Sequence, residues 1–240
     1  MSHISHLYYL PIALPLFLVM AGVVVLLIIF LPLQILRHVY MSLGVSSGAA
    51  VLLLVGTLVG GFFNIPIAEL PGRHVEAARE FSAFGVTWLE PVEVDWPGTI
   101  IAVNVGGAVI PVLMSIYLLV SRNLWGAGAL VVLVVSVICH ELARPVTGIG
   151  VAMPTFAPGL SAGIVALIVS AREAAPLAYI GGSLGALIGA DLTNLSRVEG
   201  LGAKVASIGG AGAFDGIFLT GVIAVLIAGL SPFGGARRPA

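Results

Sequence analysis

The chain has 240 residues, of which 59% are hydrophobic and only 9% are charged, and its formal net charge is −1. Soluble domains carry roughly 25% charged residues, so this composition, with a mean hydropathy of +1.15, excludes a water-soluble enzyme and predicts an integral membrane protein. The near-neutral charge and the lack of a basic run in the sequence exclude nucleic acid as a partner.

Apolar segments that are long enough to cross a bilayer recur along the chain. A transmembrane helix needs about 20 mostly apolar residues. The first such segment is too long for the apolar core of a signal peptide, and no Lys or Arg precedes it. The sequence therefore predicts one all-α domain over residues 1–240, a polytopic helical bundle in the lipid bilayer. Its seven expected spans are 8–33, 43–64, 99–120, 126–142, 156–171, 175–192 and 207–230.

One polar segment interrupts this pattern, at residues 67–98 between the second and third spans. From Glu69 to Gly98 it holds six acids and two arginines. Its part 86–96 alternates bulky and polar residues, which is typical of a short β-hairpin. About 30 residues are too few for a separate catalytic domain, so any chemistry is expected to come from the spans.

The polar residues in or beside the spans are expected at one side of the membrane. They lie near the second, fourth and sixth loops, and helices that alternate in direction place these loops on the same side. Asparagines at such positions most often satisfy backbone groups at helix ends and breaks, and a role in substrate binding is the alternative. The residues concerned are Asn64, Asn104, His140, Glu141, Asp191, Thr193, Asn194 and Asp215.

Asp191 and Asp215 are the acids that the apolar pattern makes hardest to explain, because a carboxylate in hydrocarbon is costly and usually functional. A rise of about 1.5 Å per residue places Asp191 roughly 9 Å and Asp215 roughly 13 Å from the same membrane surface. Two carboxyls at similar depth in neighbouring helices can share one proton, so that one activates water while the other polarises a carbonyl. For Asp191 the alternative is an interfacial residue that ends its helix.

Glycines repeat every four residues beside both aspartates, and this spacing lets helix backbones approach closely. At 100° per residue Asp191 lies roughly opposite the glycines of its own helix. The glycines and the carboxyl are therefore expected to face different neighbours, unless the helix is broken near Gly189. Such small-residue faces also allow a homodimer. The glycines are Gly181, Gly185 and Gly189 in the sixth span and Gly212 and Gly216 in the seventh.

The segments Gly189–Asp191 and Gly212–Gly216 resemble the aspartate motifs of the intramembrane aspartyl proteases: presenilins, signal peptide peptidases and prepilin peptidases. Their spacing departs by one residue from the Gly-x-Gly-Asp motif of that superfamily. The nearest counterpart of its Pro-Ala-Leu motif is Ala157–Leu160. A longer resemblance, carried by segments such as 102–119, is to a family of bacterial and archaeal multi-spanning proteins of unknown function. It implies a membrane fold in a prokaryotic cytoplasmic membrane.

These observations predict a hydrolase that cleaves a peptide bond of a membrane protein or peptide, with Asp191 and Asp215 as general acid and base and with no metal or cofactor. A zinc site at His140 is not expected, because Arg144 stands where H-E-x-x-H requires its second histidine. The alternatives are a proton- or cation-coupled transporter and a non-enzymatic membrane scaffold. The residues expected to support the site or bind substrate are Asn64, Asn104, Pro158, Gly189, Gly212 and Gly216.

Overall fold

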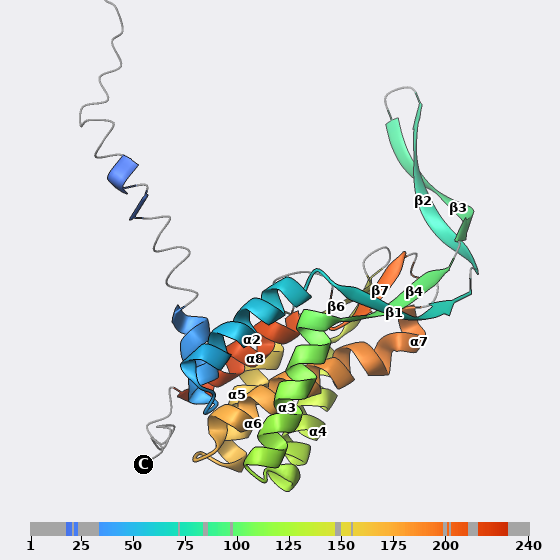
Figure 1. Ribbon diagram of the computed structural model, residues 1–240. Helices are drawn as coiled ribbons and strands as arrows, with labels where there is room; N and C mark the ends of the chain where they lie inside the picture. Colours follow the sequence, from blue (N-terminus) through green and yellow to red (C-terminus); the bar gives the residue numbers. More distant parts are fainter. Residues whose placement is uncertain are drawn as a thin grey trace, which may run out of the picture.

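Helices form the body of the protein, a small sheet lies at one end of them, and a long hairpin projects from the sheet (Figure 1). For residues 73–83, 86–96 and 216–219 the structure describes the main chain alone. The computed structural model describes residues 18–20, 22–23, 34–71, 73–83, 86–96, 98–146, 150–154, 156–198, 201, 203–210 and 216–229.

The helices of the bundle begin at residues that suit a first turn. The Ser46 side chain caps α2 by accepting a hydrogen bond from the main-chain N–H of Ala49, and prolines stand in the first turns of α3 and α5, where no intrahelical N–H is lost. The helices are α2 (Ser47–Gly60), α3 (Ile110–Ser121), α4 (Trp125–Leu142), α5 (Ala157–Val169), α6 (Ala174–Ile180), α7 (Leu195–Val198) and α8 (Gly216–Gly229), and the helix Gln34–Ser42 precedes them.

The central helical segment runs from Ala174 to Val198 and changes pitch along its length. It begins as α6, passes through two π-turns at Gly181–Gly185 and Leu187–Asp191 and a 3₁₀ turn at Leu192–Asn194, and ends as α7. Its first half contacts α3, α4, α5 and α8. The segment is therefore the buried centre of the bundle.

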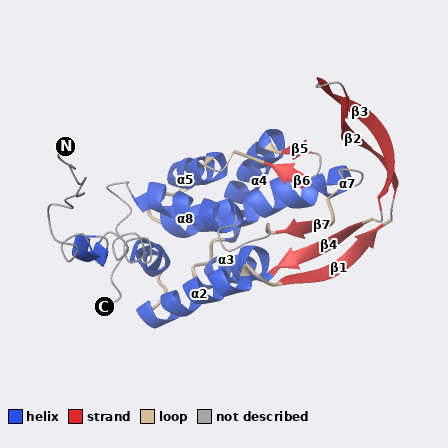
Figure 2. Ribbon diagram, turned by 90° about the horizontal axis from the view of Figure 1, so that it is seen from above, coloured by secondary structure: helices blue, strands red, loops and turns tan. Residues whose placement is uncertain are grey.

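A three-stranded sheet with the order β1-β4-β7 lies at one end of the bundle (Figure 2). β1 (Asn64–Leu70) pairs antiparallel with β4 (Thr99–Asn104), and β4 pairs parallel with β7 (Val205–Ile208). The antiparallel register sets Asn64 opposite Asn104. β4 continues directly into a π-turn, Val105–Val109, and then into α3.

The polar loop 67–98 is largely a β-hairpin. β2 (Arg73–Ala83) and β3 (Val86–Trp96) pair antiparallel over their full lengths. The hairpin predicted within 86–96 is thus only the second strand, and the first strand was missed because Glu76–Glu80 is rich in residues that favour helix. A second, much smaller hairpin follows α4 and consists of β5 (Arg144–Val146) and β6 (Gly150–Ala152).

Fewer helices are long enough to cross a membrane than the seven spans that the apolar pattern predicted. In the described part of the chain two helices are both long and apolar enough, α4 and Ala174–Val198. A third span results if Gln34–Ser42 and α2, which meet at a bend of 118°, count as one. These helices fit an integral membrane protein, but they do not support seven spans. The predicted span 8–33 lies almost entirely outside the described residues.

Several predicted spans are shorter helices because part of each apolar run belongs to the sheet. The run 99–120 begins as β4, the run 207–230 begins inside β7, and the run 43–64 reaches the first residue of β1. The run 156–171 gives a helix of 13 residues, α5. Short apolar runs rich in β-branched residues fit a strand as well as a helix, so composition alone did not distinguish them.

Candidate functional site

Polar residues from distant parts of the chain lie where the sheet joins the bundle, and they include Asn64, Asn104 and Asp191, which the sequence predicted at one side of the membrane. We call the group Asn64, Asn104, Asp191 and Ser207 the polar cluster. Its members come from the start of β1, the end of β4, the central helical segment and β7.

Asp191 is joined to the turn that follows β7. Its Oδ2 accepts a hydrogen bond from the main-chain N–H of Gly209 at 2.7 Å. Gly209 and Gly210 both have positive φ, +89° and +77°, a conformation that glycine adopts at little cost. A Cβ on Gly209 would lie 2.7 Å from the main-chain nitrogen of Ala108, so only glycine fits between the turn and the helix that follows β4.

Asn104 is the most deeply buried member of the polar cluster, with no exposed surface. Its Nδ2 donates to the Gly61 carbonyl at 2.8 Å and to Asn64 Oδ1 at 3.1 Å, and its Oδ1 accepts from Gly107 N at 2.8 Å. The side chain therefore caps the π-turn after β4 and joins it to the end of α2. This matches the expectation that asparagines here satisfy backbone groups at helix ends.

Ser207 was not identified from the sequence. Its hydroxyl donates toward Asn64 Oδ1 at 2.6 Å and also contacts the Gly210 carbonyl oxygen. A single serine in the apolar strand Val205–Ile208 carries little signal, and only the parallel pairing of β7 with β4 brings it to Asn64. Ser207 thus connects the asparagines to the turn that holds Asp191.

The glycines of the central helix and Asp191 face different neighbours, as the helical periodicity suggested. A Cβ on Gly185 would lie 2.7 Å from Val135 Cγ1, and one on Gly189 would collide with the Ser136 carbonyl oxygen, so this face packs tightly on α4. Asp191 instead reaches the turn after β7. The π-turn that includes both Gly189 and Asp191 departs from 3.6 residues per turn, but it does not bring the Asp191 carboxyl onto the glycine face.

Asp215 and Gly212 lie outside the described residues, and Gly216 is the first residue of α8. The pairing of Asp191 with Asp215 therefore stays a prediction. The described residues do fix the chain on both sides of Asp215: Gly210 follows the residue that binds Asp191, and Gly216 begins a helix that packs on α5 and α6.

Pro158 is buried in the first turn of α5, and its carbonyl accepts a hydrogen bond from Ser161 Oγ at 2.9 Å. A Cβ on the next residue, Gly159, would lie 2.8 Å from Ile223 and 3.1 Å from the Thr220 carbonyl oxygen of α8. Pro158 therefore starts the close contact between α5 and α8. Its predicted role in substrate binding stays untested.

A second group of polar residues lies one turn beyond Asp191. His140 Nδ1 is 2.8 Å from Thr193 Oγ1, which links the end of α4 to the central segment. Asn194 is fully buried and donates to the Gly189 and Ala190 carbonyls at 3.2 and 2.9 Å. The Asn194 bonds satisfy carbonyls at the end of the π-turn, and the His140 contact joins two helix ends. Within the described part of the chain, no three His, Cys, Asp or Glu residues are grouped to hold a metal ion.

The fold and the polar cluster define a helical membrane protein with a small sheet that carries polar side chains at one end. The chain belongs to the family described as "Protein of unknown function (DUF1614)", whose model matches residues 58–227. That range runs from the last turn of α2 into α8, so it includes the whole polar cluster and Asp215. No curated protein and no solved structure matches the chain. The expected resemblance to a family of unknown function is confirmed, whereas the link to proteases is not supported by these comparisons.

Proposed function

We propose that the protein is a membrane-embedded hydrolase of the aspartyl-protease kind, in which Asp191 and Asp215 share one proton and cleave a peptide bond in or near the bilayer. The observation that carries this proposal is the 2.7 Å hydrogen bond from Gly209 N–H to Asp191 Oδ2. This bond joins Asp191 to the turn after β7, and Asp215 follows Gly209 by six residues in the chain.

The packing of α8 on the central helix is compatible with such a pair. A Cβ on Gly182 would lie 3.3 Å from the Thr220 carbonyl oxygen, so the two helices are in close contact here. Gly216 is four residues from Thr220, about 6 Å along α8, and Asp191 is nine residues from Gly182, about 13 Å along its helix. The Cα of Asp215 is within about 3.8 Å of that of Gly216. Gly216 thus begins α8 about 7 Å nearer to the crossing than Asp191.

The chemistry requires only the two carboxyls and water. The ionised aspartate takes a proton from water, whose oxygen adds to the carbonyl carbon of the peptide bond, while the protonated aspartate donates a hydrogen bond to the carbonyl oxygen. The C–N bond then breaks, and the leaving nitrogen takes a proton from a carboxyl. Oδ2 of Asp191 already accepts the hydrogen bond from Gly209, so Oδ1 of Asp191 is the oxygen that takes part in catalysis. The Asp191 side chain is half-buried, which leaves Oδ1 a path to water.

The test is cleavage of a proteome-derived peptide library by the purified protein in detergent, with new N-termini identified by mass spectrometry. We expect Asp191→Asn and Asp215→Asn each to lose cleavage by about 10³-fold or more, since a shared-proton pair acts as one unit. Glu141→Gln is the matched control, because Glu141 is an exposed carboxylate at the same end of the bundle. The proposal is wrong if either aspartate variant retains the wild-type cleavage pattern.

A second candidate function, a proton- or cation-coupled transporter, is favoured by buried hydroxyls inside the bundle. Tyr179 and Ser183 are each 1% exposed, and among the described residues their hydroxyls lie near each other and near Tyr40 without a hydrogen bond of full geometry. The Tyr40 and Tyr179 rings lie 6.3 Å apart between centroids, and Tyr40 OH is 3.4 Å from Thr57 Oγ1. Buried polar groups of this kind mark ion or proton pathways in membrane proteins.

Proteoliposomes distinguish the two functions. A transporter predicts a proton or sodium flux that Tyr179→Phe reduces, whereas peptide cleavage should tolerate this variant, because Tyr179 is twelve residues from Asp191, about 18 Å along the helix. A non-enzymatic scaffold predicts neither flux nor cleavage, and predicts that both aspartates tolerate asparagine.

A further inference from the structure

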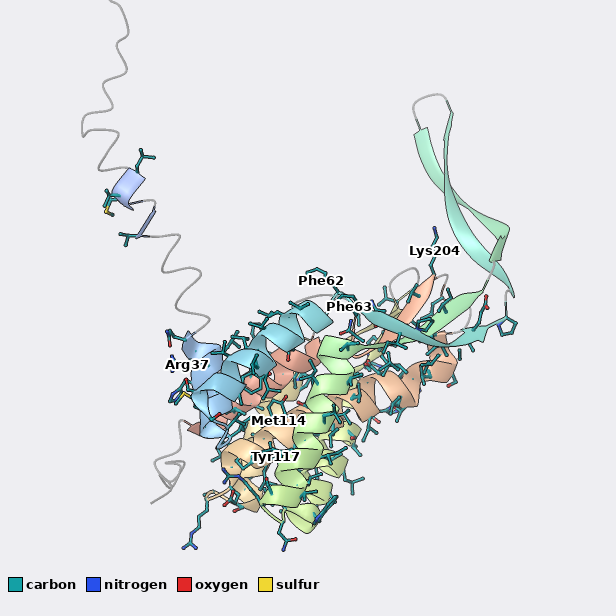
Figure 3. The ribbon with its side chains drawn as sticks, viewed as in Figure 1. Arg37, Phe62, Phe63, Met114, Tyr117 and Lys204 are labelled. Atoms are coloured by element: carbon teal, nitrogen blue, oxygen red, sulfur yellow. The ribbon has the colours of Figure 1, made fainter. Side chains whose placement is uncertain are left out.

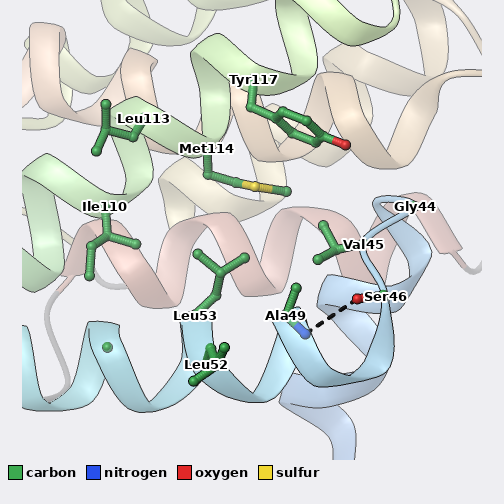
Figure 4. A pocket seen from close by; sticks show the side chains of 11 residues that line it. Gly44, Val45, Ser46, Ala49, Leu52, Leu53, Ile110, Leu113, Met114 and Tyr117 are labelled. Atoms are coloured by element: carbon green, nitrogen blue, oxygen red, sulfur yellow. Dashed lines mark hydrogen bonds between the residues drawn. The ribbon is translucent and has the colours of Figure 1, made fainter.

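An apolar groove separates α2 from α3, away from the polar cluster (Figure 4). Its volume is about 740 Å³, which lies within the roughly 300–1,000 Å³ of ligand-binding pockets. The side chains along its length are almost all aliphatic, and Leu52 and Leu113 at its edges are 75% and 61% exposed. The lining residues are Gly44, Val45, Ser46, Ala49, Leu52, Leu53, Gly56, Ile110, Leu113, Met114 and Tyr117.

The groove is apolar along its length and polar at one mouth, where helix Gln34–Ser42 turns into α2. Ser46 lies at this mouth, and the Tyr117 side chain extends toward the same end, as Figure 4 shows. Arg122 Nη2 donates to the Leu43 carbonyl at 3.1 Å, and a Cβ on Gly44 would touch this nitrogen. A guanidinium therefore borders the mouth of the groove.

A second guanidinium contacts Ser47, the residue next in the chain to the mouth. Arg37 Nε donates to Ser47 Oγ at 3.0 Å, and its Nη2 contacts the same oxygen; Ser47 directly follows Ser46 of the groove. Arg122 is paired with Glu173 at 3.0 Å, whereas Arg37 has no acidic partner among the residues that the structure describes. Arg37 therefore brings a positive charge close to the apolar groove, and Figure 3 places it far from Lys204 at the sheet.

We propose that the groove binds one acyl chain of an anionic phospholipid, whose phosphate lies at the mouth beside Arg37 and Arg122. Three properties of the groove match such a lipid: a narrow apolar tract, exposure toward the surface of a membrane protein, and positive charge at one end only. An arginine attracts anionic headgroups near the membrane surface and binds phosphate through more than one N–H. An apolar helix in the groove would have no negative group to pair with the arginines at the mouth.

The length of the groove suits part of an acyl chain. Ile110 and Tyr117 are seven residues apart, about 10 Å along α3, and Ala49 and Gly56 are also seven residues apart along α2. An acyl chain that enters at the mouth would thus be buried in the groove over the part next to its headgroup, and the remainder would lie in the bilayer. The proposal is independent of the proposed hydrolase activity, because no member of the polar cluster lines the groove.

The test is native mass spectrometry of the full-length protein, purified in detergent and mixed with equal amounts of phosphatidylglycerol and phosphatidylcholine. We expect one retained phosphatidylglycerol, favoured by about fivefold, the preference that one arginine confers near a membrane surface. Arg37→Gln should abolish this preference and still leave a lipid bound. Lys204→Gln is the matched control, because Lys204 is an exposed cation at the sheet, far from Arg37 (Figure 3).

A second pair of variants tests the groove itself. A Cβ on Gly56 would lie 3.5 Å from Ile110, an ordinary contact, so Gly56→Phe can fold and fill the groove. Gly48→Phe adds the same side chain on the same helix, where nothing lies within 4 Å. We expect Gly56→Phe to reduce lipid retention about tenfold and Gly48→Phe to leave it unchanged, with both proteins showing the wild-type circular dichroism.

Three outcomes would overturn the proposal. Equal lipid retention by Gly56→Phe and Gly48→Phe would place the lipid elsewhere. Equal binding of the two lipids by the wild-type protein would remove the role of Arg37. Absence of any retained lipid would mean that protein covers the groove, either the apolar segment 8–33 or a second copy of the chain.

Discussion

Asn104→Asp is the substitution that most directly tests how the polar cluster is held together. It keeps the size and shape of the side chain and keeps the acceptor for Gly107 N–H. It removes the donor to Gly61 O, which is 2.8 Å away, and the donor to Asn64 Oδ1 at 3.1 Å. At neutral pH the new carboxylate would place negative charge against both of these oxygens.

The expected cost follows from burial. Asn104 is 0% exposed and Gly61 is buried, so the Gly61 carbonyl loses its side-chain partner without access to water, which costs about 1–3 kcal/mol. Burial of an unpaired carboxylate adds to this cost until the group protonates. We expect a loss of at least about 3 kcal/mol, a large part of the roughly 5–15 kcal/mol by which proteins are stable.

The assay is denaturant unfolding in detergent micelles followed by circular dichroism. Asn123→Asp is the matched control, because Asn123 is exposed and has a φ of +52° that aspartate also tolerates; a change within about 0.5 kcal/mol is expected there. The pH dependence gives a further check. Once protonated, the introduced carboxyl can again donate a hydrogen bond to Gly61 O, so folding favours the protonated form. The loss of unfolding free energy relative to the wild type should therefore be smaller near pH 4 than near pH 8. Equal effects of the two substitutions at pH 8 would refute the reasoning.

Two further predictions concern the packing of the bundle and its surface. Gly189→Ala should destabilise the protein by about 1–3 kcal/mol, because the added methyl meets the Ser136 carbonyl of α4. Gly126→Ala is the control and should be neutral or stabilising, because nothing lies within 4 Å of its added methyl. Thermal unfolding that ranks the two variants in reverse order would contradict this packing. A double-mutant cycle on Arg122 and Glu173, whose side chains are 32% and 36% exposed, should give a coupling energy below about 1 kcal/mol, and a larger value would show that solvent does not screen the pair.

Much of the general character of the protein was predictable from the sequence. Its composition indicates a membrane protein, and the apolar runs predict α4 and α5 close to their observed boundaries and the start of α6 to within one residue, because an apolar run without nearby strand partners forms a helix. The expectation that Asn64, Asn104 and Asp191 lie at one end of the bundle followed from the alternating direction of the helices. The glycines beside Asp191 indicated close helix packing, since no other residue allows such an approach.

The sheet was not predictable from local patterns. The apolar runs at 99–104 and 205–208 resemble parts of spans. They are strands because β4 pairs with β1 and, across about 100 residues of intervening chain, with β7. Hydropathy measures the transfer of side chains from water, and it does not specify whether backbone groups bond within a helix or between strands. For this reason the described helices do not support seven spans.

The contacts of the candidate site depend on the same pairing. The parallel register of β4 and β7 places Ser207 beside Asn64 and brings Gly209 to Asp191, and neither contact has a local signal in the sequence. The chain by itself therefore indicated the membrane class, most of the helices and most of the polar residues of the candidate site. Only the tertiary structure decided which of them touch, because hydrogen bonds between distant segments depend on register and on the close approach that particular glycines permit.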